Sequence, residues 1–67
     1  MPVVTIYMWS GVSPEAKKKI VSGVTKVFED LNIPREAVEV IIVETPKENW
    51  GVAGELASEK FKHAKTP

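Results

Sequence analysis

Apolar residues dominate the start of the chain. Residues 3–9 read Val-Val-Thr-Ile-Tyr-Met-Trp, and this β-branched and aromatic content predicts a β-strand. Side chains alternate between the two faces of a strand, which separates Val4, Ile6 and Met8 from the other positions of the run. Both faces are largely apolar, so we expect both to be covered in the assembled protein.

A helical repeat of apolar residues follows a Ser-Gly turn. Ser13, Pro14 and Glu15 are typical of a helix start, with a hydroxyl N-cap, a proline at the first helical position and an acid in the first turn. Asn32 and Pro34 end the predicted helix. The apolar positions predict one stripe facing a core: Ala16, Ile20, Val24, Val27, Phe28 and Leu31.

A second apolar run, residues 38–43, predicts another strand. The order strand, long helix, strand predicts a right-handed βαβ unit with parallel strands. Gly51 and Gly54 then indicate a tight hairpin or bulge. Residues 55–62 have weak helical character, and residues 64–67 are expected to be frayed.

The predicted fold class is α/β, a single βαβ unit of two parallel strands and one long helix, followed by a C-terminal hairpin. We find no repeat or linker, so residues 1–67 are expected to form a single domain. Two strands and one helix cannot cover both sheet faces, so protomers should pack sheet to sheet or edge to edge. A chain this short buries only about 60% of its unfolded surface, which makes oligomerisation the expected stabilising device.

Charge and composition exclude several classes of partner. Nine basic and nine acidic residues give no net charge, which argues against nucleic acid and membrane as partners. Lysines 17–19 lack the interleaved aromatic residues of a nucleic-acid groove. No apolar stretch reaches membrane length and no secretory segment is seen, so we expect a cytoplasmic protein. With no cysteine and only His63, neither a metal site nor a cofactor is expected.

Pro2 is the main candidate for chemistry. If Met1 is removed, the chain begins with a secondary amine, and an ordinary α-amino group has a pKa of about 7.7–8.0. Burial in an apolar pocket disfavours the ammonium form and lowers that pKa, which would make Pro2 a general base near neutral pH. If Met1 is retained, the nitrogen is a tertiary amide and takes no proton. The structural alternative is a proline that merely opens a strand.

Several features of the chain occur together: Pro2 before an apolar strand, the Ser10-Gly11 turn, a helix, a second strand, and the sequence Trp-Gly-Val-Ala-Gly-Glu-Leu-Ala-Ser at residues 50–58. This combination resembles the 4-oxalocrotonate tautomerase family. The resemblance implies a βαβ fold assembled into dimers and commonly hexamers. It also implies a one-base tautomerisation, in which the Pro2 nitrogen takes a proton from an enol, or from a carbon beside a carbonyl, and returns it to another carbon. Trp50 matches the aromatic residue that the family places over its flat substrate.

Two positions depart from the family's pattern. Its best-known members carry an arginine just after the glycine of the first turn, where this chain has Val12, and another early in the second strand, where it has Glu39. The family's arginines bind the carboxylates of a dicarboxylate substrate and polarise its carbonyl oxygen. Glu39 should repel an anion and raise the pKa of the Pro2 amine. We therefore expect a small enolisable 2-oxo acid or ketone as the substrate.

Three groups could replace the arginines: the amides at the helix start near Ser13, Lys17 one turn further on, and Arg35 from a neighbouring protomer. A related enzymatic alternative uses the Pro2 amine as a nucleophile that forms an iminium with an aldehyde. A non-enzymatic alternative is a tautomerase-fold oligomer, with dimers as building blocks, that binds a small aromatic ligand or serves structurally. The candidate substrate contacts beside Pro2 are Trp50, Val12, Glu39 and Ser13.

Overall fold

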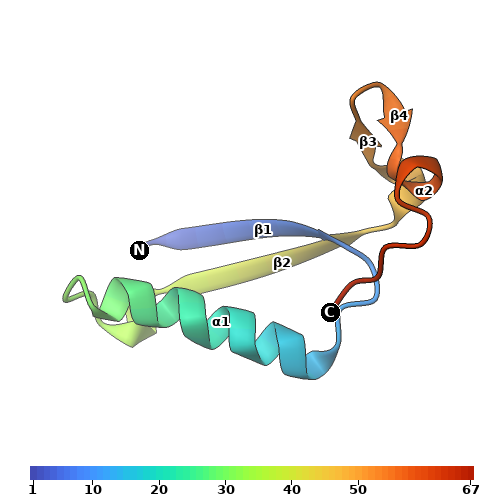
Figure 1. Cartoon of the computed structure of the whole chain (residues 1–67). Helices are drawn as coiled ribbons and strands as arrows, with labels where there is room; N and C mark the ends of the chain where they lie inside the picture. Colours follow the sequence, from blue (N-terminus) through green and yellow to red (C-terminus); the bar gives the residue numbers. More distant parts are fainter.

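A two-stranded parallel sheet forms the centre of the molecule, and one long helix crosses one of its faces (Figure 1). The computed structural model describes all 67 residues of the chain. Strand β1 spans Val3–Trp9, helix α1 spans Pro14–Glu29 and strand β2 spans Glu39–Thr45. The two strands pair in register along their whole length. This confirms the predicted α/β fold, although β2 begins and ends later than the predicted residues 38–43.

A small hairpin follows β2 at the far end of the molecule from the N-terminus (Figure 1). Strands β3 (Gly51–Val52) and β4 (Glu55–Leu56) pair antiparallel, which confirms the predicted hairpin. Helix α2 spans only Ala57–Lys60, so the helical character expected from residue 55 is wrong at the two positions that form β4. Two short 3₁₀ turns precede β2 and β3: Arg35–Ala37 and Lys47–Asn49.

Helix α1 begins as predicted and ends earlier. The Ser13 hydroxyl oxygen accepts a hydrogen bond from the Ala16 amide at 3.1 Å, which caps the helix N-terminus. The helix ends at Glu29, and Asn32 adopts a left-handed φ of 66° in the turn that follows. Leu31 therefore lies outside the helix and is 65% exposed, and Val27 is 58% exposed on α1, so the predicted places of both residues on the core stripe are wrong.

Only one face of the sheet is covered within the protomer. Ile6 and Met8 are half-buried on the face that α1 covers, whereas Val3, Tyr7 and Ile41 point to the other face and are at least half exposed. The cover expected over both faces is therefore absent from a single chain. We call the uncovered surface the open face; it is formed by Val3, Thr5, Tyr7, Glu39, Ile41 and Val43.

The protomer exposes more surface than a self-sufficient monomer of its size. Its accessible surface is 4945 Å², against about 4,200 Å² expected for a folded monomer of this mass. Its radius of gyration is 14.5 Å, against about 11 Å for a compact domain of this length. Only Val12, Thr25 and Ala57 are buried, and no large side chain is fully buried. None of its helices is long and apolar enough to cross a membrane.

If the open face is an interface between protomers, Ile41→Lys is expected to reduce the mass of the assembly in solution. A lysine at this position would put a charge into an apolar contact, where it loses hydration without a partner. Light scattering coupled to size exclusion measures the mass. Val27→Lys is a matched control, because Val27 is 58% exposed but lies on α1. A loss of mass in the control alone would place the interface on the helix instead.

Candidate active site

Pro2 sits at the beginning of β1, where its backbone is tied to β2. Its carbonyl oxygen accepts a hydrogen bond from the Glu39 amide at 3.0 Å, and the preceding Met1 amino group donates to the Ala37 carbonyl at 2.8 Å. Pro2 itself is half-buried. Because the bond to Glu39 uses the carbonyl of Pro2, it does not depend on Met1, and it would still tie the Pro2 backbone to β2 after Met1 is removed.

Glu39 lies at the same end of the sheet as Pro2. It pairs in register with Val3, so its side chain joins Val3 on the open face. The side chain is exposed and forms no ion pair within the protomer. Glu39 and Pro2 therefore share one end of the sheet, with the Glu39 side chain on the open face.

Trp50 lies at the opposite end of β1, inside an aromatic cluster. Its ring contacts Trp9 edge to face, with centroids 6.2 Å apart and planes at 78°. Phe61 packs on Trp9 with a centroid distance of 5.7 Å. The Lys47 ammonium lies 4.8 Å from the centroid of the Trp9 ring, within cation–π range. These contacts hold Trp50 at the rim of the sheet rather than leaving it as a loose side chain.

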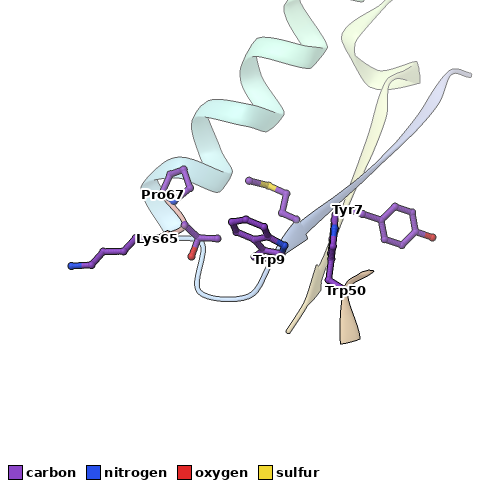
Figure 2. A pocket seen from close by; sticks show the side chains of 7 residues that line it. Tyr7, Trp9, Trp50, Lys65 and Pro67 are labelled. Carbon is purple, nitrogen blue, oxygen red and sulfur yellow. The ribbon is translucent and has the colours of Figure 1, made fainter. Parts of the chain in front are cut away.

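A shallow groove of about 320 Å³ runs beside the two tryptophans (Figure 2). Figure 2 shows Trp9 and Trp50 next to each other at the end of β1, while the Tyr7 ring points away from Trp9. Residues from the C-terminal end of the chain close the other side of the groove, among them Lys65 and Pro67. We call this hollow the Trp50 groove. Its mostly apolar walls suit a flat ligand.

Pro2 and Trp50 do not share a site within one protomer. Pro2 precedes the first residue of β1, and Trp50 contacts Trp9, the last residue of that strand. Seven residues of extended chain span about 20 Å. Figure 1 likewise places the N-terminus and the hairpin at opposite ends of the sheet. A ligand that touches both residues therefore needs two protomers.

The first turn is filled by the protein's own carboxylate. The Glu44 side chain accepts hydrogen bonds from the Gly11 amide at 2.9 Å and the Val12 amide at 3.0 Å, and it forms an ion pair with Lys17 at 2.7 Å. The Lys17 ammonium, together with the two amides, holds the pKa of Glu44 below its usual value. Val12 is only 5% exposed, so the structure places its side chain in the interior.

Two of the three proposed substitutes for the arginines are already occupied. The Ser13 hydroxyl caps α1, and its amide donates to the Pro67 carbonyl oxygen at 3.2 Å. Lys17 is paired with Glu44. Arg35 is exposed and forms no ion pair, and it lines a shallow groove along α1.

A family model described as tautomerase enzyme matches residues 2–60 of the chain. The chain belongs to the tautomerase family. It is 45% identical over 60 residues to a 2-hydroxymuconate tautomerase of Comamonas testosteroni, covering 88% of this chain and 95% of that protein. It is 42% identical over 60 residues to a 2-hydroxymuconate tautomerase of Pseudomonas putida, with the same coverage. These matches identify the protein as an enzyme with tautomerase activity.

Solved structures of the tautomerase family share the fold. TomN, a 4-oxalocrotonate tautomerase homologue of the tomaymycin biosynthetic pathway, superposes with a TM-score of 0.84 at 34% identity, covering 91% of this chain and 95% of that one. A fused 4-oxalocrotonate tautomerase, described as an asymmetric trimer, superposes with a TM-score of 0.77 at 30% identity, covering 82% of this chain and 46% of that one. The protein is thus similar to these tautomerases over nearly all of its length.

Sequence reasoning missed three parts of this region. Glu44 follows an apolar run, and nothing in the local sequence predicts that its side chain bonds the first turn, 32 residues away. Lys47 looked like a loop residue, but it binds two carbonyl groups of the C-terminal segment. Residues 64–67 were expected to be frayed, which is wrong, because Thr66 and Pro67 bond the first turn. Alternation and spacing report which face a side chain occupies, but they do not report such long-range polar contacts.

Glu44→Gln is expected to destabilise the protein above pH 4.5, and this effect should shrink as the pH falls below that value. A carboxylate with a lowered folded pKa contributes stability above its unfolded pKa and loses it as the pH falls through the folded pKa. Melting temperatures of both proteins between about pH 7 and pH 3 test this. Glu48→Gln is the control, since Glu48 is exposed and unpaired. An unchanged difference at about pH 3 would contradict the assignment.

Proposed function

We propose that this tautomerase shifts a proton within a small enolisable 2-oxo acid or ketone, with the Pro2 amine as general base after removal of Met1. The observation that carries the proposal is the position of Pro2, which is held at the start of β1 by the bond from its carbonyl oxygen to the Glu39 amide. The segment matched by the family begins at this residue. Once Met1 is removed, the Pro2 nitrogen is the α-amino group of the chain, a class of group that ordinarily titrates at about 7.7–8.0.

The proposed reaction needs one group that both accepts and returns a proton. The neutral prolyl nitrogen takes the proton from the hydroxyl of the enol, or from the carbon beside the carbonyl. The resulting ammonium then delivers the proton to another carbon of the conjugated system, and the nitrogen returns to its neutral form. The proton count of the substrate is unchanged, so the reaction requires neither an oxidant nor a cofactor.

The site is proposed to lie between protomers. Pro2 and Trp50 are at opposite ends of β1, so a substrate over Pro2 is covered by the Trp50 groove of another chain. The open face and the excess surface of the protomer support such an assembly. The fused relative is an asymmetric trimer. For this chain we propose a homo-oligomer built from dimers, with a hexamer as the complete assembly.

The charge around the site favours a substrate with at most one carboxylate. Glu39 is exposed and unpaired at the same end of the sheet as Pro2, and we expect it to repel the second carboxylate of a dianion. At the other end of the site the first turn holds buried Val12 in place of an arginine, and Lys17 is neutralised by Glu44. We therefore propose a mono-acid or a ketone as the substrate rather than a dicarboxylate.

Pro2→Ala is expected to lower kcat/KM for ketonisation of an enol mono-acid by about 10²- to 10⁴-fold, the usual contribution of a positioned base. The protein must first be shown by intact mass to begin at Pro2. Absorbance in the ultraviolet follows the enol. Pro14→Ala is the control, because Pro14 opens α1 at the other end of the molecule.

The same assay compares an enol mono-acid with an enol diacid. Faster turnover of the mono-acid is the expected result, since Glu39 opposes a second negative charge. Preference for the diacid would contradict the proposed substrate class. Equal rates for Pro2→Ala and wild type would contradict the assigned base, and a native protein that retains Met1 would contradict it as well.

A further inference from the structure

The seven residues after the family-matched segment, 61–67, fold back along the end of β1 and the first turn (Figure 1). We call them the C-terminal tail. Phe61 packs on Trp9, and the Lys47 ammonium donates to the carbonyl of Phe61 at 2.7 Å and to that of Ala64. The same ammonium lies over the Trp9 ring, so one lysine joins the tail to the aromatic cluster.

The last residues of the tail are tied to the turn between β1 and α1. The Thr66 hydroxyl donates to the Ser10 carbonyl at 2.9 Å, and the Ser13 amide donates to the Pro67 carbonyl at 3.2 Å. A side chain at Gly11 would meet the Thr66 hydroxyl at 3.0 Å, so the tail lies tightly against this turn. The bonds of Thr66 and Pro67 follow Lys65 in the chain, and the bonds from Lys47 to Phe61 and Ala64 precede it. The backbone of Lys65 is therefore held on both sides.

Lys65 lies at the rim of the Trp50 groove and is the only cationic residue that lines it. Figure 2 shows its side chain extending outward from the tail, away from the two tryptophan rings. A lysine stem of four carbons can rotate its ammonium towards a ligand in the groove while the backbone stays in place. No acidic residue lines this groove.

Three other lysines at this end of the molecule are already paired, and Lys62 does not line the groove. Lys17 binds Glu44, Lys60 binds Glu55, and Lys47 binds the tail carbonyls. Lys65 has neither an ion pair nor a side-chain hydrogen bond. It is therefore the cation in this groove that can bind an anion without first losing a partner.

We propose that Lys65 binds the carboxylate of a planar mono-acid that lies in the Trp50 groove, and so replaces the arginine that is absent at Val12. As a specificity determinant for the substrate, this assignment rests on the function proposed above. A single ammonium acts as a point charge for one carboxylate, whereas two arginines would hold two. Because Lys65 is the one cationic side chain that lines the groove, the groove matches a ligand with one carboxylate.

Binding of benzoate tests the assignment without any turnover. Trp9 and Trp50 line the groove, so quenching of their fluorescence reports on its occupancy. Lys65→Ala is expected to weaken benzoate binding by about tenfold, the loss of one charge-assisted contact, and to leave neutral benzamide unaffected. Lys65→Arg should restore most of the affinity for benzoate.

Lys62→Ala is the matched control. Lys62 carries the same charge on the same tail, is exposed, and does not line the groove. Its removal should leave benzoate binding unchanged. An equal loss in both variants would show a general effect of tail charge and overturn the proposal. Weaker binding of benzamide to Lys65→Ala would show a damaged groove and overturn it too.

Kinetics separate this inference from the proposed function. With an enol mono-acid, Lys65→Ala should raise KM about tenfold and leave kcat nearly unchanged, and it should have no effect on an enolisable ketone that lacks a carboxylate. If wild type turned over neither substrate yet bound benzoate through Lys65, the proposed function would fail and the binding site would stand. If turnover were normal and KM for the mono-acid did not change in Lys65→Ala, the inference would fail alone.

Discussion

A single helix laid across two strands leaves one face of the sheet and both of its edges open. In this protein α1 covers Ile6 and Met8, while Tyr7 and Ile41 remain at least half exposed on the open face. No large side chain is fully buried, so the apolar area removed from water within one chain is small. Burial of the remaining apolar surface requires other copies of the chain. The proposed active site follows from the same constraint, because Pro2 and Trp50, its two proposed halves, lie at opposite ends of β1.

The chemistry of the two ends differs. At one end the carbonyl of Pro2, the proposed base, is bonded to β2, and Glu39 lies on the open face at the same end of the sheet. At the other end Glu44 bonds both the first turn and Lys17, so the Lys17 ammonium is already paired and is not free to bind a ligand. The tail then brings a different cation, Lys65, to the rim of the Trp50 groove. The chain thus has the fold of the family, and in the proposed site a lysine takes the place of an arginine.

Local patterns in the sequence predicted most of the fold. Alternation located β1, the Ser-Pro pair located the start of α1, and glycines located the hairpin. The end of α1 was placed too late because Leu31 continues the apolar helical spacing, although the helix already ends at Glu29 before the left-handed turn at Asn32. The tail was expected to be frayed because its own sequence offers no apolar pattern. Its order comes from bonds to Lys47 and to the first turn, which are far away in the sequence.

In the proposed assembly, one site uses Pro2 of one chain and Trp50 of another. Pro2→Ala and Trp50→Ala proteins should therefore be unfolded together, refolded as mixed oligomers and assayed against each variant refolded alone. Random mixing of equal amounts leaves about a quarter of the shared sites with both residues intact, so activity should rise above the mean of the two parent proteins. Activity equal to that mean at every mixing ratio would show that each chain carries a complete site, and would contradict the account.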